Sequence, residues 1–277
     1  MNSYRLTVYE KAMPTTLNWS DKLIASKASG FDGIEISIDE TEEKLSRLDW
    51  SAAERKSLLS LTKDTNTCIH TMCLSGHRKF PLGSNDPEVC ARGMEIARKA
   101  IDFADDLEIR IIQLAGYDVY YEQSTADTVA RFGENLAKVV DMASKKGVIL
   151  AFETMETPFM NTISKSMVYV NAINSPYLQI YPDVGNVSNG TNDVISDIKS
   201  GKGHIVAAHL KDTMPGIFRD LHYGEGQVDF PLVIQQLKAQ GVGIYNAEFW
   251  YSPSYKNGDW KAALAQAHDF LRPLLED

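Results

Sequence analysis

The sequence predicts an α/β fold of the (β/α)8 TIM-barrel type, in a single domain over residues 1–277. Three observations predict it. Eight short β-branched or apolar runs alternate with longer amphipathic segments, and the runs begin roughly 34 residues apart, about the length of a βαβ repeat. The chain of 277 residues suits a barrel, which typically needs about 250. No Pro/Gly/Ser-rich linker or low-complexity segment divides it, which favours one domain.

The first elements along the chain follow a strand–helix–strand order. Residues 5–9 (RLTVY) predict a strand, and residues 20–29 predict the helix after it. The second strand is predicted at residues 33–37 (GIEIS), and the polar helical segment 39–65 predicts two helices with a break in its middle. This order is that of a parallel βαβ unit.

The next two repeats are separated by a long loop. The third strand is predicted at residues 67–72 (TCIHTM), and the loop CLSGHRKFPLGSND leads into a helix over residues 87–104. The fourth strand is predicted at residues 109–114 (IRIIQL). A helix over residues 126–146 follows, because a Ser-Thr pair before it offers an N-cap and a glycine follows its end.

The second half of the chain repeats the same alternation. Its predicted strands are residues 148–153, 178–183, 204–209 and 244–248. Its predicted helices are residues 164–172, 194–199, 230–240 and 260–275. Near-continuous apolar runs such as VILAF are typical of parallel strands covered on both faces. An open doubly wound sheet is the alternative, but it usually carries a Gly-rich turn after its first strand, where this chain has EKAMP.

Composition excludes some classes of partner. The formal net charge of −9 argues against general nucleic-acid binding, which usually needs a basic face. No apolar run approaches the roughly 18 residues that span a bilayer, and the N-terminus lacks the apolar region of a signal peptide. The three cysteines form no CxxC pair, which favours reduced thiols. We therefore expect a cytoplasmic protein with no nucleic-acid or membrane partner.

Four consecutive predicted strands end on a side chain that can bind a metal: Glu153, Asp183, His209 and Glu248. Active sites of such barrels lie at the C-terminal ends of the strands, so the four should meet at one mouth. One carboxylate at a strand end is more often a cap, but three converging there repel one another unless a cation or shared protons compensate them. Three carboxylates and one imidazole predict one divalent metal ion such as Mn²⁺, Zn²⁺ or Co²⁺.

Several segments resemble the sugar-phosphate isomerase/epimerase superfamily of barrels, and the resemblance covers essentially the whole chain. They are AFETMETPFMNTISK (151–165), YPDVGN (181–186), HLKDTMPGIFRDLHYGEGQVDF (209–230) and AEFW (247–250). The segments MCLSGHRKFPLGS (72–84) and YEKAMP (9–14) make the chain most similar to the L-ribulose-5-phosphate 3-epimerase family, also called L-xylulose-5-phosphate 3-epimerases.

The resemblance implies a function and roles for individual residues. It makes the four strand-end residues the metal ligands, and Glu153 and Glu248 the acid–base pair. It implies interconversion of L-ribulose 5-phosphate and L-xylulose 5-phosphate through an enediolate, with one carboxylate on each face of the sugar. It also implies a homodimer. Free-ketose 3-epimerases of the superfamily tend to have His at the position matching Asn186, so Asn186 favours a phosphorylated substrate.

Other polar residues near strand ends are candidates for binding a small sugar phosphate. Arg78 can clamp a phosphate through two parallel N–H bonds. Glu225, and Glu35 within the second strand, are candidates to orient a substrate hydroxyl or a metal ligand. A surface or structural role is the alternative for each. The substrate-binding candidates are Lys11, His70, His77, Arg78, Asn161, Asn186, Lys211, Arg219 and Glu225.

Three rival functions use part of the same pattern. A free-ketose 3-epimerase or an aldose–ketose isomerase would keep the same metal platform. An endonuclease related to this barrel would need a multi-metal cluster and a basic surface, whereas this chain is acidic and has six histidines in all. A non-catalytic barrel that only binds sugar phosphates would not need both glutamates.

Overall fold

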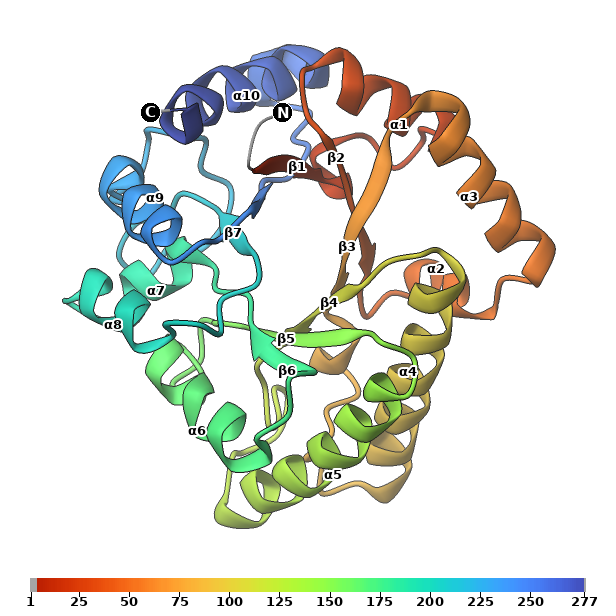
Figure 1. Ribbon diagram of the computed structural model, residues 1–277, viewed down its shortest axis with the longest axis vertical. Coiled ribbons are helices and arrows are strands. Elements are labelled where there is room, and N and C mark those ends of the chain that lie inside the picture. Colours follow the sequence, from red (N-terminus) through yellow and green to blue (C-terminus); the bar gives the residue numbers. More distant parts are fainter. Residues whose placement is uncertain (1–3, 277) are drawn as a thin grey trace.

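The computed structural model describes residues 4–276, which form eight parallel strands curled into a barrel with helices around it (Figure 1). The strands are β1 (Arg5–Tyr9), β2 (Gly33–Ile38), β3 (Cys68–Leu74), β4 (Ile111–Ala115), β5 (Ile149–Glu153), β6 (Leu178–Ile180), β7 (Ala208–Leu210) and β8 (Ile244–Ala247). The predicted fold class is confirmed. The domain limits at residues 1 and 277 stay a prediction, because residues 1–3 and 277 lie outside the described part.

The helices cover the outside of the strands. The α-helices are α1 (Trp19–Ala28), α2 (Glu42–Leu45), α3 (Ala52–Thr65), α4 (Pro87–Asp106), α5 (Ala126–Ser144), α6 (Ile163–Ile173), α7 (Val184–Gly190), α8 (Val194–Ser200), α9 (Phe230–Ala239) and α10 (Trp260–Glu276). Short 3₁₀ helices are η1 (Glu10–Ala12), η2 (Ser46–Asp49), η3 (Gly76–Arg78) and η4 (Tyr255–Gly258). None of these described helices has both the length and the apolar composition needed to cross a membrane.

The strand order is β6-β5-β4-β3-β2-β1-β8-β7, so consecutive strands are neighbours except where the chain closes on itself. Strand β1 pairs in parallel with both β2 and β8, which brings the two halves of the chain together. At the seam between β6 and β7, isolated parallel bridges join Ile180 to Ile205 and Asp183 to His209. This circular order is the topology of a (β/α)8 barrel.

Side chains alternate along each strand between the helix layer and the barrel interior. On β5, Leu150 and Phe152 belong to the main apolar core, which also contains buried helix residues such as Leu136. Ala151, between them, belongs to a separate small cluster with Ile111, Tyr181 and Ala207 from three other strands or strand ends. The next inward-facing residue of β5, two positions after Ala151, lies at the C-terminal mouth of the barrel. This residue is Glu153, so the alternation of side chains places its carboxylate at the mouth.

Two strands, β6 and β7, are half as long as predicted. Strand β6 ends at Ile180 rather than at residue 183, because Pro182 has no N–H for the ladder and Asp183 already serves as the N-cap of α7. Strand β7 begins at Ala208 rather than at residue 204. The helix α7 was not predicted, since VGNVSNG has two glycines and little apolar periodicity. Asp183 therefore joins the site from a helix start rather than from within a strand.

Candidate metal centre and active site

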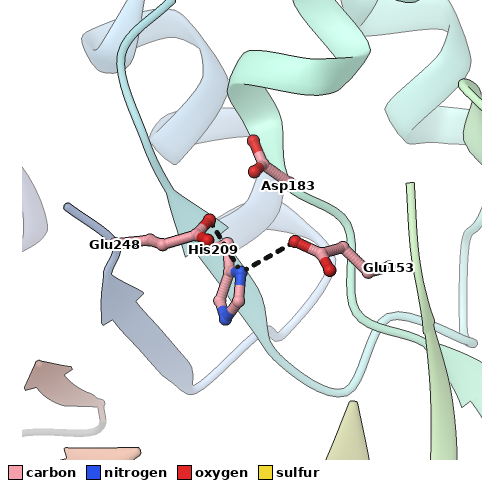
Figure 2. Close-up of side chains that lie close together, drawn as sticks. All are labelled: Glu153, Asp183, His209 and Glu248. Atoms are coloured by element: carbon pink, nitrogen blue, oxygen red, sulfur yellow. Dashed lines mark hydrogen bonds and ion pairs between the residues drawn. The ribbon is translucent and has the colours of Figure 1, made fainter. Parts of the chain in front are cut away.

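The four strand-end residues converge at the mouth of the barrel (Figure 2). One ligand atom from each of Glu153, Asp183, His209 and Glu248 lies within 4.8 Å of the others, and all four side chains are buried. His209 Nδ1 lies 3.2 Å from Glu153 Oε1 and 3.0 Å from Glu248 Oε2. The residues come from β5, the start of α7, β7 and the end of β8, so the barrel topology brings distant parts of the chain together.

Lys211, two residues after His209, adds a buried positive charge. Its ammonium contacts Asp183 Oδ2 and lies 3.6 Å from Glu248 Oε2. Burial alone would raise the pKa of Glu248, but the charges of Lys211 and His209 outweigh it and hold that pKa well below its ordinary value. Burial alone would likewise lower the pKa of Lys211, but Asp183 and Glu248 outweigh it and raise that pKa.

The donor set fits a divalent cation. Asp183 Oδ2 and Glu248 Oε2 are buried, yet neither accepts a well-aligned hydrogen bond from any residue in the range 4–276. Buried carboxylate oxygens without hydrogen bonds are costly unless a cation contacts them. Burial, with the nearby carboxylates of Glu248 and Glu153, raises the pKa of Asp183 above its ordinary value, although the charge of Lys211 acts in the opposite direction. The cluster could therefore hold a metal ion through three oxygens and one nitrogen.

A cavity opens at the mouth of the barrel, and Glu153 and Glu248 are the two residues of the cluster that line it. Glu153 and Glu248 line it from opposite parts of the sheet, since β5 and β8 are separated by β4, β3, β2 and β1 along one path and by β6 and β7 along the other. Tyr9, Met155 and Trp250 contribute apolar surface beside these acids. The arrangement leaves space for a small polar molecule between two carboxylates.

Five of the nine substrate-binding candidates line this cavity: Lys11, Arg78, Asn186, Lys211 and Arg219. The Arg78 guanidinium lies 5.6 Å and 5.2 Å from the ring centroids of Tyr117 and Tyr120, and donates to the Tyr117 hydroxyl at 3.3 Å. Arg219 lies 5.4 Å from the centre of the Trp250 ring. Lys11 pairs with Asp39 at 2.5 Å. Four cationic side chains thus share one cavity with the acidic cluster.

The other four candidates lie outside the cavity lining. His70 contacts the Asp32 carbonyl at 3.3 Å, before the start of β2. His77 is buried against the Gly93 carbonyl at 3.1 Å, and burial lowers its pKa to about 4. The Asn161 amide oxygen accepts from Lys165 at 2.7 Å, and exposed Glu225 accepts from the His222 amide at 2.8 Å. Each therefore has a local structural partner.

Sequence reasoning missed several residues of the lining. Cys73, Ser75, Glu156 and Phe218 line the cavity, as does Tyr9 at the end of β1. Tyr9 and Cys73 could have been found from strand-end position, which is the signal that identified the metal ligands. Glu156 accepts from Tyr117 at 2.6 Å and from Tyr120 at 3.3 Å, a contact between two loops that has no local sequence signal.

Asp212 organises the loop that brings Arg219 to the cavity. Its buried carboxylate accepts from the amides of Gly224 and Gly226 at 2.9 Å and of Val228 at 3.3 Å. A Cβ added at Gly226 would overlap both Asp212 Oδ1 and the Thr213 carbonyl oxygen. The glycine of GEGQVD is therefore required for this close approach.

We expect Gly226→Ala to lower the free energy of unfolding by about 1–3 kcal/mol, because the displaced Asp212 carboxylate stays buried without its donors. Chemical denaturation measures this change, and hydrogen exchange should become faster in residues 213–228. Gly133→Ala in α5 is the matched control, since the nearest atom to the new Cβ, Tyr169 Cε1, lies 3.8 Å away. That change should be neutral or stabilising by up to about 1 kcal/mol. Equal stability of the two variants would contradict this role of the glycine.

Known proteins share this fold and sequence. L-ribulose-5-phosphate 3-epimerase UlaE of Salmonella heidelberg (strain SL476) is 48% identical over 268 residues, covering 96% of this chain and 93% of the relative. UlaE of Escherichia coli O139:H28 is also 48% identical over the same length.

Solved structures agree on the fold. The D-allulose 3-epimerase of Methylomonas sp., in complex with D-allulose, has a TM-score of 0.79 at 18% identity, over 99% of this chain and 98% of that one. A structure of L-ribulose 3-epimerase has a TM-score of 0.78 at 22% identity, over 99% and 95% of the two chains. A family model described as Xylose isomerase-like TIM barrel matches residues 23–274. The chain therefore belongs to the xylose isomerase-like TIM barrel family.

Proposed function

We propose that this protein is a metal-dependent 3-epimerase that interconverts L-ribulose 5-phosphate and L-xylulose 5-phosphate by two-base proton transfer at C3. The observation that carries the proposal is the placement of Glu153 and Glu248 on separate strands of one cavity, beside a ligand set for a divalent cation. The relatives at 48% identity, named L-ribulose-5-phosphate 3-epimerases, support the substrate.

The chemistry needs a proton removed from one face of the sugar and another returned to the opposite face. Glu153 and Glu248 approach the cavity from β5 and from the end of β8, so a ketose between them meets one carboxylate on each side. One acts as the base and the other as the acid, and the roles exchange with the isomer bound. Glu153, Asp183, His209 and Glu248 would hold a divalent cation such as Mn²⁺, Zn²⁺ or Co²⁺, which would supply a Lewis acid for the negative charge that develops during proton transfer.

The cations around the cavity suit a phosphate group. Arg78 packs beside two tyrosine rings that contact each other, so little side-chain entropy is lost when it binds an anion. Its Nε is buried and donates no hydrogen bond to any residue from 4 to 276, which leaves that donor for a ligand. Lys11 and Arg219 add positive charge, while buried Lys211 stays paired with Asp183. Asn186 offers a buried amide oxygen without a hydrogen bond from the same residues.

Proton exchange in D₂O tests the reaction directly. The protein is incubated with L-ribulose 5-phosphate or with free L-ribulose, in the presence of Mn²⁺ or of a chelator. We expect deuterium at C3 of the phosphorylated sugar only, and its loss with the chelator. Label at C1 would indicate an aldose–ketose isomerase, and equal exchange with the free sugar a free-ketose 3-epimerase. No exchange with Mn²⁺ present would leave only a sugar-phosphate-binding barrel. The homodimer and the cytoplasmic location stay predictions.

Replacing either glutamate should slow the reaction. Glu153→Gln and Glu248→Gln each keep the shape of the side chain but remove the group that accepts the proton, so we expect kcat to fall by about 10²–10⁴. Turnover of both epimers under saturating Mn²⁺ measures the loss. Glu156→Gln is a control on the same cavity wall, where the carboxylate accepts from two tyrosines. Undiminished turnover of Glu153→Gln would contradict the two-base mechanism.

Arg78→Met should separate phosphate binding from chemistry. The variant keeps a long side chain beside the tyrosine rings but removes the charge, so we expect KM for the phosphorylated ketose to rise about 10-fold to 100-fold, as for a lost charged hydrogen bond. Steady-state kinetics measure KM and kcat, and the smaller change is expected in kcat. Arg110→Met is the control, because Arg110 pairs with Asp105 before β4, at the other end of the barrel. An unchanged KM would remove Arg78 from the phosphate site.

A further inference from the structure

Glu35 is a carboxylate buried in the barrel interior, beneath the metal-ligand cluster. It lies on β2, its side chain is fully buried, and it does not line the cavity. Its Oε1 accepts from His209 Nε2 at 2.7 Å and from Asn246 Nδ2 at 2.9 Å. Its Oε2 accepts from Thr71 Oγ1 at 2.7 Å and from the Tyr181 hydroxyl at 3.0 Å. These four contacts occupy the acceptor positions of both carboxylate oxygens.

The contact with His209 decides which ring nitrogen can bind a cation. His209 Nδ1 faces the carboxylates of Glu153 and Glu248, and the other ring nitrogen points away from them (Figure 2). That second nitrogen, Nε2, meets Glu35, which can only accept a hydrogen bond when ionised. An Nε2–H that donates to Glu35 leaves Nδ1, the ring nitrogen that faces the cluster, free to give its lone pair to a cation bound there.

Neighbouring strands fix Glu35 in this position. Thr7 Oγ1 on β1 donates to Asn246 Oδ1 at 2.9 Å, which turns the Asn246 amide nitrogen toward Glu35. Thr71 lies on β3, and Tyr181 follows β6. Because each partner lies on or directly after a strand of the barrel, the carboxylate has little freedom to leave His209.

We propose that Glu35 is a positioning residue that holds His209 in the Nε2–H tautomer, and so presents Nδ1 to the divalent cation. The inference rests on the proposed metal-dependent function and deepens it. Glu35 touches no substrate, and its contribution is to the orientation and basicity of the imidazole. Carboxylates that accept from a metal-binding histidine typically contribute about 10-fold to 100-fold in metal affinity.

Two variants separate the parts of this contribution. Glu35→Gln can keep its amide oxygen toward His209 and Asn246 and place its NH₂ against the hydroxyls of Thr71 and Tyr181, so the charge is lost but the acceptor stays. We expect Mn²⁺ affinity to fall about 10-fold. Glu35→Met removes the acceptor as well, and we expect a loss of about 100-fold. Calorimetric titration of chelator-treated protein with Mn²⁺ measures both values, independently of turnover.

A buried carboxylate far from the site controls for simple destabilisation. Asp197 accepts from the backbone amides of Ile163 and Ser164, at 2.7 and 3.0 Å, where α8 packs on the start of α6. Asp197→Asn should lower the melting temperature and leave Mn²⁺ affinity within about twofold of the unmodified protein. A purely structural role for Glu35 would produce this same pattern in Glu35→Gln.

Nitrogen-15 NMR of histidine-labelled protein reads the tautomer without any variant at Glu35, with His209→Gln identifying the resonance. With Zn²⁺ bound, we expect the directly bonded proton on Nε2 of His209 and a metal-shifted Nδ1. A proton on Nδ1, or Mn²⁺ affinity of Glu35→Gln within twofold of the unmodified protein, would each overturn the proposal. Failure of the unmodified protein to bind Mn²⁺ would overturn the metal-dependent function as well. Tight binding without C3 exchange would overturn the function alone.

Discussion

Negative charge buried inside the barrel is the constraint on which the rest of the site depends. Glu35, Glu153, Asp183 and Glu248 place four carboxyl groups around one imidazole and one ammonium. In a medium of low dielectric such groups repel one another strongly, and burial alone disfavours their ionised forms. The protein compensates part of this charge with Lys211 and with hydrogen bonds to Glu35. The oxygens of Asp183 and Glu248 that face the cluster lie near Lys211 but accept no well-aligned hydrogen bond from residues 4–276.

The buried polar groups form two layers in the barrel interior, one around Glu35 and one at the mouth, and the two differ in how fully their hydrogen bonds are satisfied. The lower layer, around Glu35, is fully satisfied by Thr71, Tyr181, Asn246 and His209, so it is rigid and holds no free acceptor at Glu35. The upper layer, at the mouth, keeps unsatisfied oxygens beside a polar cavity. His209 belongs to both, since one ring nitrogen faces each layer. The hydrogen bonds of the lower layer therefore fix the orientation of the imidazole, and with it the position of the ring nitrogen in the upper layer.

Much of the fold and the metal cluster could be predicted from the sequence, because strand periodicity determines which residue ends each strand. Glu153, His209 and Glu248 follow directly from that position. Residues of the lower layer could have been predicted in the same way, because inward-facing residues recur at every second position of a strand. Asn246, two positions before Glu248, is one example. The roles of loop residues could not be predicted in this way. Glu225 and His77 are polar in the sequence, but Glu225 contacts its own loop and His77 packs under a helix. Tertiary contacts without local periodicity decide their roles.

The seam between β6 and β7 connects the candidate site to the closure of the whole barrel. Backbone pairing there is reduced to two isolated bridges, one of them between Asp183 and His209. The sheet therefore has its least regular strand pairing at the seam where Asp183 and His209, two of the proposed ligands, meet. A cation bound by both side chains would tie these edges together, so the closure of the ring and the occupancy of the centre would be thermodynamically linked. The seam is therefore the part of the ring whose closure such a cation would favour most directly.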